Sequence, residues 1–227
     1  MKRPTRGRRP QPGRGERSRA ASAPPTGVRI IAGAWKGRRL RTPPGLLLRP
    51  MREQVRGALF NILGPEALEG ARVLDLFSGS GSLGIEALSR GALRAAFVER
   101  EPACLEVLRA NLAAVGAGSR ATVVPHDLSR GLAGLAAHGP FELVLMHPPF
   151  AVLRAAPGPG EADVEALLGE LARSRELLVA GGIVAFETPR ERWVDPAPLE
   201  ALGLAVELRR EYGTTALFVT RQGPAQP

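Results

Sequence analysis

Residues 73–84 read VLDLFSGSGSLG, an apolar run that passes into a turn containing Gly79, Gly81 and Gly84. The run before the first glycine predicts a buried strand, and the residues after the turn predict a helix. A strand, a glycine-rich turn and a helix in this order are typical of the ligand-binding crossover in doubly wound sheets. The stretch therefore predicts an α/β fold with a ligand at the turn.

From residue 71 onward, strand patterns alternate with helix patterns. We expect strands at 71–77, 95–99, 121–125, 141–146, 181–187, 204–210 and 215–220, and helices at 81–91, 102–116, 129–137, 162–178 and 196–202. Such alternation makes a parallel sheet with both faces covered, whereas the last two strands flank a turn and predict a hairpin. We therefore expect a doubly wound, mostly parallel, seven-stranded, Rossmann-like sheet with a C-terminal antiparallel hairpin.

Three parts follow one another along the chain. Residues 1–27 are rich in Arg, Pro, Gly and Ser, which predicts a disordered basic tail. Residues 28–65 contain VRIIA and RRLRT on either side of GAWKG, which predicts a small β-hairpin, and then a helical pattern at 51–63. Residues 66–222 hold the α/β domain.

Charge is concentrated in the N-terminal quarter. Residues 1–27 and 28–56 each carry a net charge of +7, while the whole chain carries +9, which leaves a mildly acidic body of −5. Such asymmetry indicates a polyanionic partner, most simply nucleic acid. For residues 1–27, a tail that only aids solubility fits equally well.

Composition excludes several classes of protein. The single cysteine, Cys104, allows no internal disulfide and favours a reducing compartment. The longest apolar stretches are only as long as strands, and no apolar segment follows the basic N-terminus, so we expect neither a membrane span nor a secretory signal. We expect a cytoplasmic protein, and nothing in the sequence demands more than a monomer.

Asp75 decides which ligand suits the glycine-rich turn. The G-x-G-x-x-G string alone also fits a nicotinamide dehydrogenase. Asp75 lies four residues before the first glycine, where its carboxylate would repel a pyrophosphate. S-adenosylmethionine carries an α-amino group and a sulfonium but no phosphate. It is therefore the expected cofactor, and the dehydrogenase is the last alternative.

Two more carboxylates end the second and third strands of the α/β pattern. Glu99 is placed to accept the ribose hydroxyls, and Asp127, next to His126, to accept the adenine amine. The alternative for each is a cap on the following helix. The predicted cofactor-binding residues are Asp75, Phe77, Gly79, Gly81, Glu99 and Asp127.

Residues 143–150 read LVLMHPPF, the end of the fourth strand and a rigid turn. A polar side chain at His147 and the carbonyl of Pro148 can accept hydrogens from an exocyclic amine of a base and localise its lone pair. The prolines fix the turn, and Phe150 can stack on a flipped base. The predicted catalytic residues are His147, Pro148, Pro149 and Phe150. The alternative is an ordinary strand end with a buried phenylalanine.

Over about residues 28–220 the chain resembles the bacterial ribosomal RNA guanine-N2 methyltransferases of the RsmD type. The segments RIIAGAWKGRRL, RPMREQVRGALFNIL, VLDLFSGSGSLGIEALSRGA, FVERE and LMHPPF carry the resemblance. It implies a class I S-adenosylmethionine-dependent methyltransferase that modifies the 2-amino group of a guanine in 16S ribosomal RNA. It also implies that Asp75, Glu99 and Asp127 serve the cofactor. The partner would be the small ribosomal subunit or its assembly intermediate.

The N-terminal hairpin and helix are expected to bind this RNA. Arginines there are candidates for phosphate contacts, and Trp35 either stacks on a base or packs against the hairpin. The predicted RNA-binding residues are Arg29, Trp35, Lys36, Arg38, Arg39, Arg49, Arg52 and Arg56.

The sequence departs from the family pattern at three positions. His147 stands where the family has aspartate, Met51 replaces a threonine, and Gly57 replaces an acidic residue. A carboxylate only accepts hydrogen bonds, whereas a neutral imidazole offers one acceptor nitrogen and an imidazolium offers none. We expect retained activity that rises from pH 6 to pH 8. The alternatives are an adenine-N6 or other amino methyltransferase on nucleic acid, and an RNA-binding homologue with impaired catalysis.

Overall fold

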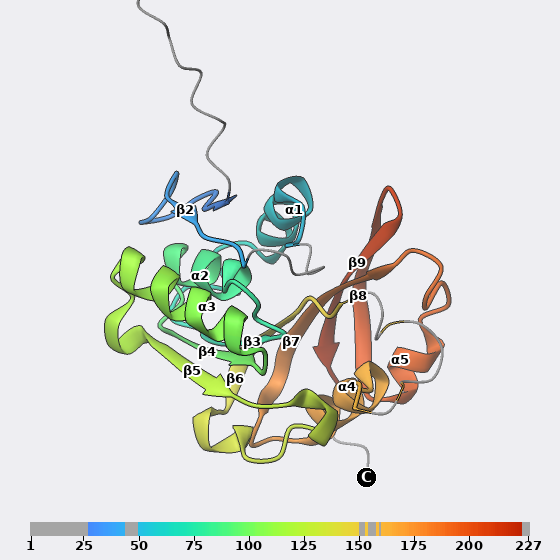
Figure 1. Cartoon of the computed structure of the whole chain (residues 1–227). Coiled ribbons are helices and arrows are strands. Elements are labelled where there is room, and N and C mark those ends of the chain that lie inside the picture. The colour runs from blue at the N-terminus through green and yellow to red at the C-terminus, as the bar shows by residue number, and fades with distance from the viewer. Residues whose placement is uncertain (1–26, 44–49, 150–152, 154–157, 159, 224–227) are drawn as a thin grey trace, which may run out of the picture.

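The computed structural model describes residues 27–43, 50–149, 153, 158 and 160–223. A seven-stranded sheet in the order β5-β4-β3-β6-β7-β9-β8 forms its body, with only β9 and β8 antiparallel to their neighbours (Figure 1). The predicted doubly wound sheet with a C-terminal antiparallel hairpin is therefore confirmed. The strands are β3 (Arg72–Leu76), β4 (Arg94–Glu99), β5 (Ala121–Pro125), β6 (Phe141–Met146), β7 (Leu178–Pro189), β8 (Leu204–Tyr212) and β9 (Thr215–Gln222).

Helices cover both faces of the sheet (Figure 1). Within the described ranges, none combines the length and apolar character that a membrane crossing needs. The α-helices are α1 (Glu53–Leu63), α2 (Ser82–Ser89), α3 (Pro102–Val115), α4 (Val164–Arg173) and α5 (Ala197–Ala201), and the 3-10 turns are η1 (Gly118–Arg120), η2 (Leu128–Arg130) and η3 (Leu135–His138).

Two of the predicted helices need correction. The expected helix at 129–137 is replaced by η2 and η3, because Gly131 and Gly134 take left-handed φ values of 75° and 83° that no helix continues. The helix expected at 162–178 is the shorter α4. Asp163 starts it by accepting the Glu165 and Ala166 amides, and β7 already begins at Leu178.

The central strands are buried on both faces, which explains their continuous apolar runs. Val73 and Leu143 face the core under α1, α2 and α3, while their neighbours Leu74 and Val144 face the core under α4 and α5. Both faces of β3 and β6 are thus closed to solvent, and only the carboxyl ends of the strands are left to form a site.

The N-terminal hairpin is shorter than its sequence suggested. β1 (Val28–Arg29) and β2 (Arg39–Leu40) pair at only two positions. The Ile30 amide still donates to the Arg38 carbonyl across the hairpin, but the amides of Ile31 and Ala32 donate to the Glu86 side chain of α2. Hairpin and α1 share one apolar core with α2 and α3. The boundary at residue 65 therefore does not separate two cores, and it stays a prediction.

Close packing fixes the glycine-rich turn. Gly79 and Gly81 have φ values of 53° and 82°, in the left-handed region that favours glycine. Gly84 lies in α2, where a Cβ would stand 2.4 Å from Cε1 of Phe97 and 3.0 Å from Oδ2 of Asp75. The third glycine therefore lets α2 approach β4, and it also places the first turn of α2 over Asp75.

We expect Gly84→Ala to lower the free energy of unfolding by about 1–3 kcal/mol, because the buried Phe97 ring cannot move aside without strain. Gly57→Ala is the matched control, since a Cβ there meets only Cδ1 of Ile31 at 3.7 Å. In α1 this substitution should stabilise the protein by about 0.5–1 kcal/mol. Urea unfolding of both variants measures the difference. Equal effects of the same sign would contradict the packing argument.

Candidate active site

Strand order brings the two predicted motifs to one edge of the sheet. β4 and β5 lie on one side of β3, while β6 and β7 lie on the other, so the order reverses at β3. Leu76 of β3 pairs in register with Met146 of β6, and Met146 in turn pairs with Phe186 of β7. The residues that follow, Phe77, His147 and Glu187, therefore lie side by side at the carboxyl ends, where doubly wound folds bind ligands.

Asp75 is almost fully buried beneath the glycine-rich turn. Its Oδ2 accepts a hydrogen bond of 2.8 Å from the Gly84 amide. Burial raises the pKa of Asp75 to about 7, and the nearby charge of Glu99 adds to the rise, while the Gly84 hydrogen bond opposes it. Oδ1 receives no hydrogen bond from any residue in the described part of the chain. One oxygen of this buried carboxyl thus remains available for a cationic group.

Glu99 ties three backbone amides together. Its carboxylate accepts from Gly79 at 2.8 Å, from Arg100 at 2.8 Å and from Glu101 at 2.9 Å. The first bond holds the glycine-rich turn against β4, and the other two hold the start of α3. These amides precede α3, which has no side-chain cap hydrogen bond, so Glu99 is not the helix cap considered as its alternative role. A carboxylate has about four acceptor positions, so capacity for a ribose hydroxyl remains.

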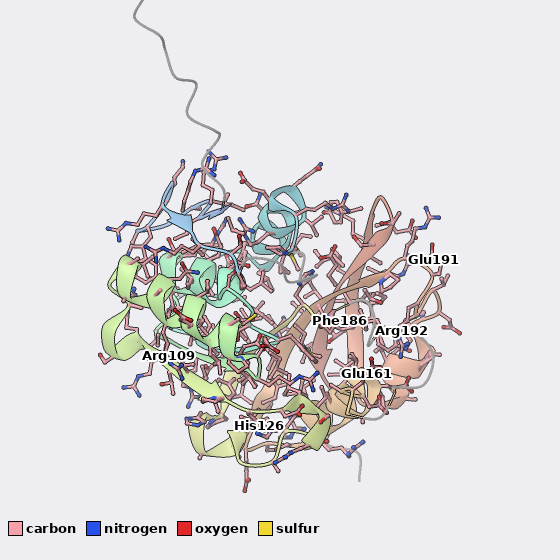
Figure 2. The ribbon with its side chains drawn as sticks, viewed as in Figure 1. Arg109, His126, Glu161, Phe186, Glu191 and Arg192 are labelled. Carbon is pink, nitrogen blue, oxygen red and sulfur yellow. The ribbon has the colours of Figure 1, made fainter. Side chains whose placement is uncertain are left out.

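Asp127 is a partly exposed cap. Its Oδ1 accepts from the Ser129 amide at 3.0 Å, which starts η2, and pairs with the Arg100 guanidinium at 3.1 Å. The Ser129 hydrogen bond contributes most to lowering the pKa of Asp127. Arg100 also donates to the Gly160 carbonyl, and no sequence pattern singled this arginine out. His126 lies close by, with Nε2 2.8 Å from the Gly131 carbonyl (Figure 2).

These groups fit S-adenosylmethionine better than a dinucleotide. Asp75 and Glu99 place two buried carboxylates under the turn, which suits a cationic ammonium and disfavours a pyrophosphate. If Gly79 carried a Cβ, no atom would lie within 4 Å of it. The turn therefore leaves room for a ligand to approach the backbone there. In the described ranges, no group of three His, Cys, Asp or Glu side chains could hold a metal ion.

His147 directly follows β6 and contacts a partner that the sequence analysis missed. Its Nε2 lies 3.1 Å from Oε2 of Glu187, which lies near the end of β7 and directly follows Phe186, the register partner of Met146. Glu187 is 3% exposed and His147 19%. The segment GGIVAFE held the signal, because its last residue is a carboxylate at the same edge. Pro148 and Pro149 follow His147 as predicted, whereas Phe150 lies outside the described residues.

Burial raises the pKa of Glu187, but other groups outweigh it. The imidazole of His147, the Thr215 hydroxyl and the charge of Arg52 leave the pKa of Glu187 below its ordinary value. Glu187 is therefore a carboxylate at neutral pH, next to the imidazole of His147.

Most of the basic residues predicted to contact RNA are exposed or lie outside the described residues. Lys36 and Arg39 are exposed on the hairpin. Arg29 pairs with Glu53, Arg38 donates to the Ala114 and Val115 carbonyls, and Arg52 donates to the Tyr212 carbonyl. These remain RNA candidates, while Arg49 lies outside the described residues.

Two of the predicted RNA contacts need correction. Arg56 is 1% exposed, and it donates to the carbonyls of Met51 and Arg29. It cannot reach a phosphate, so its assignment as an RNA contact is wrong. Trp35 is also buried, with the Arg120 guanidinium 4.8 Å from its ring centre. The packing alternative for Trp35 therefore describes it correctly.

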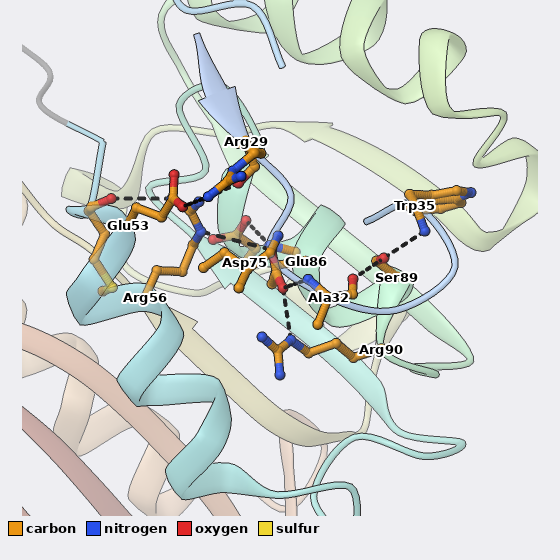
Figure 3. A network of polar contacts seen from close by, with 12 residues as sticks. Arg29, Ala32, Trp35, Glu53, Arg56, Asp75, Glu86, Ser89 and Arg90 are labelled. Atoms are coloured by element: carbon orange, nitrogen blue, oxygen red, sulfur yellow. Dashed lines mark hydrogen bonds and ion pairs between the residues drawn. The ribbon is translucent and has the colours of Figure 1, made fainter. Parts of the chain in front are cut away.

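Glu86 attaches the N-terminal segment to α2 (Figure 3). It is fully buried and accepts from the Ile31 and Ala32 amides at 2.8 and 3.0 Å, and from Nε of Arg90 at 2.8 Å. Nε of Arg56 lies 3.9 Å away. One carboxylate thus compensates two partly buried amides and two guanidinium groups.

Glu86→Ala should lower the free energy of unfolding by about 3–5 kcal/mol, because it leaves a buried guanidinium and two amides unpaired. Hydrogen exchange should accelerate at the amides of Ile31 and Ala32. Glu53→Ala is the control, since it breaks only the exposed pair with Arg29, and its cost should stay below about 1 kcal/mol. Similar costs for the two variants would contradict the attachment role.

Comparison with known proteins shows the family. The family described as "Conserved hypothetical protein 95" matches residues 28–221. YlbH of Bacillus subtilis, named provisionally as an rRNA methyltransferase, is 33% identical over 197 residues, which cover 86% of this chain and 99% of the relative. Ribosomal RNA small subunit methyltransferase D of Escherichia coli K12 is 43% identical over 124 residues, 54% of this chain and 60% of the relative.

Comparison with solved structures points to the same family. The structure of yhhF from Escherichia coli, described provisionally as a methyltransferase, superposes with a TM-score of 0.67 at 32% identity, covering 86% of this chain and 98% of that one. A hypothetical protein of Thermus thermophilus gives 0.64 at 31% identity, covering 85% and 98%. The chain therefore belongs to the Conserved hypothetical protein 95 family and is a methyltransferase of the RsmD type.

Proposed function

We propose that this protein transfers a methyl group from S-adenosylmethionine to the exocyclic 2-amino group of a guanine in 16S ribosomal RNA. The observation that carries the proposal is the meeting of the glycine-rich turn and His147-Pro148-Pro149 at one sheet edge, in a chain of this family. The Escherichia coli relative is named for the small-subunit ribosomal RNA, which supports this substrate class.

The cofactor would lie along the ends of β3, β4 and β5. S-adenosylmethionine, when bound, supplies a methyl group made electrophilic by its sulfonium. Oδ1 of Asp75 accepts from the ammonium, Glu99 accepts from a ribose hydroxyl, and Asp127 accepts from the adenine amine. Gly79 and Gly81 let the backbone pass close to the methionine and ribose portions, and Phe77 turns the chain there with a φ of 60°.

The target base would lie over the end of β6. The imidazole of His147 and the carbonyl of Pro148 accept hydrogens from the 2-amino group, which localises its lone pair toward the methyl group. The two prolines hold these acceptors in place. Phe150 follows directly and is proposed to stack on the flipped base.

The N-terminal segment would hold the RNA backbone. Lys36 and Arg39 are exposed, and Arg29, Arg38 and Arg52 border the same basic segment and remain proposed phosphate contacts. We propose a monomer that acts in the cytoplasm on the small subunit or on its assembly intermediate.

Methyl transfer to small ribosomal subunits that lack native methylation tests the function. Labelled S-adenosylmethionine should yield N2-methylguanosine at one position, and mass spectrometry of the digested RNA identifies it. N6-methyladenosine as the product, or no product from wild type but labelling by His147→Asp, would contradict the proposal.

Affinity for S-adenosylhomocysteine should depend on Asp75. Its pKa of about 7 means that the ligand-free carboxyl is largely protonated at pH 6, and binding of an ammonium must expel that proton. Affinity should therefore rise about tenfold from pH 6 to pH 8, and Asp75→Asn should be weaker and independent of pH. Asp127→Asn is the control. Because the pKa of Asp127 is lowered, that group is ionised throughout, and its substitution should leave the pH dependence of the affinity in place. Calorimetric titration measures all three proteins. A pH dependence that survives in Asp75→Asn would refute the assignment.

A further inference from the structure

Glu187 and His147 form a pair that the sheet register creates. Met146 and Phe186 are in-register neighbours of two parallel strands, so the residues after them are also neighbours. Nε2 of His147 lies 3.1 Å from Oε2 of Glu187, and the carboxylate is 3% exposed. A buried carboxylate at hydrogen-bond distance from an imidazole restricts both the rotation and the tautomer of the ring.

The contact decides which nitrogen of His147 accepts. A carboxylate only accepts hydrogen bonds, so the nitrogen that faces Glu187 carries the proton. In the neutral ring Nδ1 is then the acceptor. The pair of a neutral imidazole and a carboxylate carries one negative charge, which equals the charge of the aspartate that the family pattern has at position 147.

We propose that Glu187 is a positioning residue for methyl transfer: it holds His147 as the Nε2-protonated tautomer, so that Nδ1 accepts from the amine that is methylated. The proposal rests on the proposed function for its substrate. With Glu187, His147 substitutes for the missing aspartate as an acceptor with the same net charge.

The reaction shows what the pair would do. A bond forms between the guanine 2-nitrogen and the methyl carbon, and the carbon–sulfur bond of the sulfonium breaks with its electron pair remaining on sulfur. One proton leaves the amine and goes to Nδ1 of His147, which becomes an imidazolium. Glu187 then faces that imidazolium as its counter-ion.

Other groups around the pair keep Glu187 ionised. The Thr215 hydroxyl of β9 and the positive charge of Arg52, at the start of α1, also lower the pKa of that carboxyl. Arg52 donates to the carbonyl of Tyr212, the last residue of β8, at 2.7 Å. The start of α1 is thus bonded to the end of β8, and the charge of Arg52 acts on Glu187.

Nitrogen-15 NMR of the histidine rings tests the tautomer directly in the wild-type protein, with His147→Gln used to assign the signal. We expect a protonated Nε2 and an unprotonated Nδ1 at pH 8. A protonated Nδ1 would overturn the proposal. This readout needs no activity, so it is independent of whether guanine is the substrate.

Kinetics test the consequence. Glu187→Gln should lower kcat at least tenfold, because the imidazole loses the partner that fixes its tautomer, and should leave KM for RNA and affinity for S-adenosylhomocysteine within about twofold. The double variant His147→Asp/Glu187→Gln carries one carboxylate again. It should recover most of the rate.

The control variant is Glu191→Gln, which makes the same change just beyond β7 on a side chain that is 74% exposed, and its rate should equal that of wild type. Full activity of Glu187→Gln, or a double variant no faster than Glu187→Gln, would overturn the positioning role. If wild type instead makes no N2-methylguanosine, the proposed function fails, while the tautomer measurement still decides the pair.

Discussion

Two buried carboxylates hold the glycine-rich turn, and the arrangement of the site follows from them. Asp75 accepts from the Gly84 amide and Glu99 from the Gly79 amide, so the turn is fixed to the ends of both β3 and β4. Gly84 has no room for a side chain, which brings α2 against Phe97. The same carboxylates that shape the turn also make its surroundings anionic, and this favours a ligand with a positive charge.

The position of α2 in turn fixes the N-terminal segment. Glu86 and Ser89, both on α2, bond to the backbone between Ile31 and Trp35. Gly33 lies so close that a Cβ would stand 1.7 Å from the Ser89 carbonyl oxygen. The basic segment is therefore anchored to the helix that starts at the proposed cofactor turn. In this way one turn sets the geometry of both the cofactor site and the proposed RNA surface.

Much of this could be predicted from the sequence, because periodicity reports burial on one or both faces of an element. Alternation of strands and helices predicted the sheet, and strand ends placed Asp75, Glu99, Asp127 and His147 at one edge. The role of Glu187 could not be foreseen, since a strand-end carboxylate looks the same whether it caps a helix or orients a histidine. Only the pairing of β6 with β7 brings it to His147.

Burial of charged and aromatic side chains was the weakest part of the prediction. Arg56 is four residues from Arg52 on the helix and looked like a second surface charge. Its burial depends on Glu86, on another helix, and on the Arg29 carbonyl, and no local pattern signals either contact. Gly131 and Gly134 are the opposite case, because their left-handed conformations interrupt a stretch whose composition favoured a helix.

The position of S-adenosylhomocysteine in a crystal structure of its complex with this protein is the most direct measurement. The account predicts its ammonium at Oδ1 of Asp75, its ribose at Glu99, and its sulfur facing the end of β6 beside His147, with Glu187 still bonded to the imidazole. A ligand bound away from the glycine-rich turn, or a sulfur directed away from His147, would contradict the account.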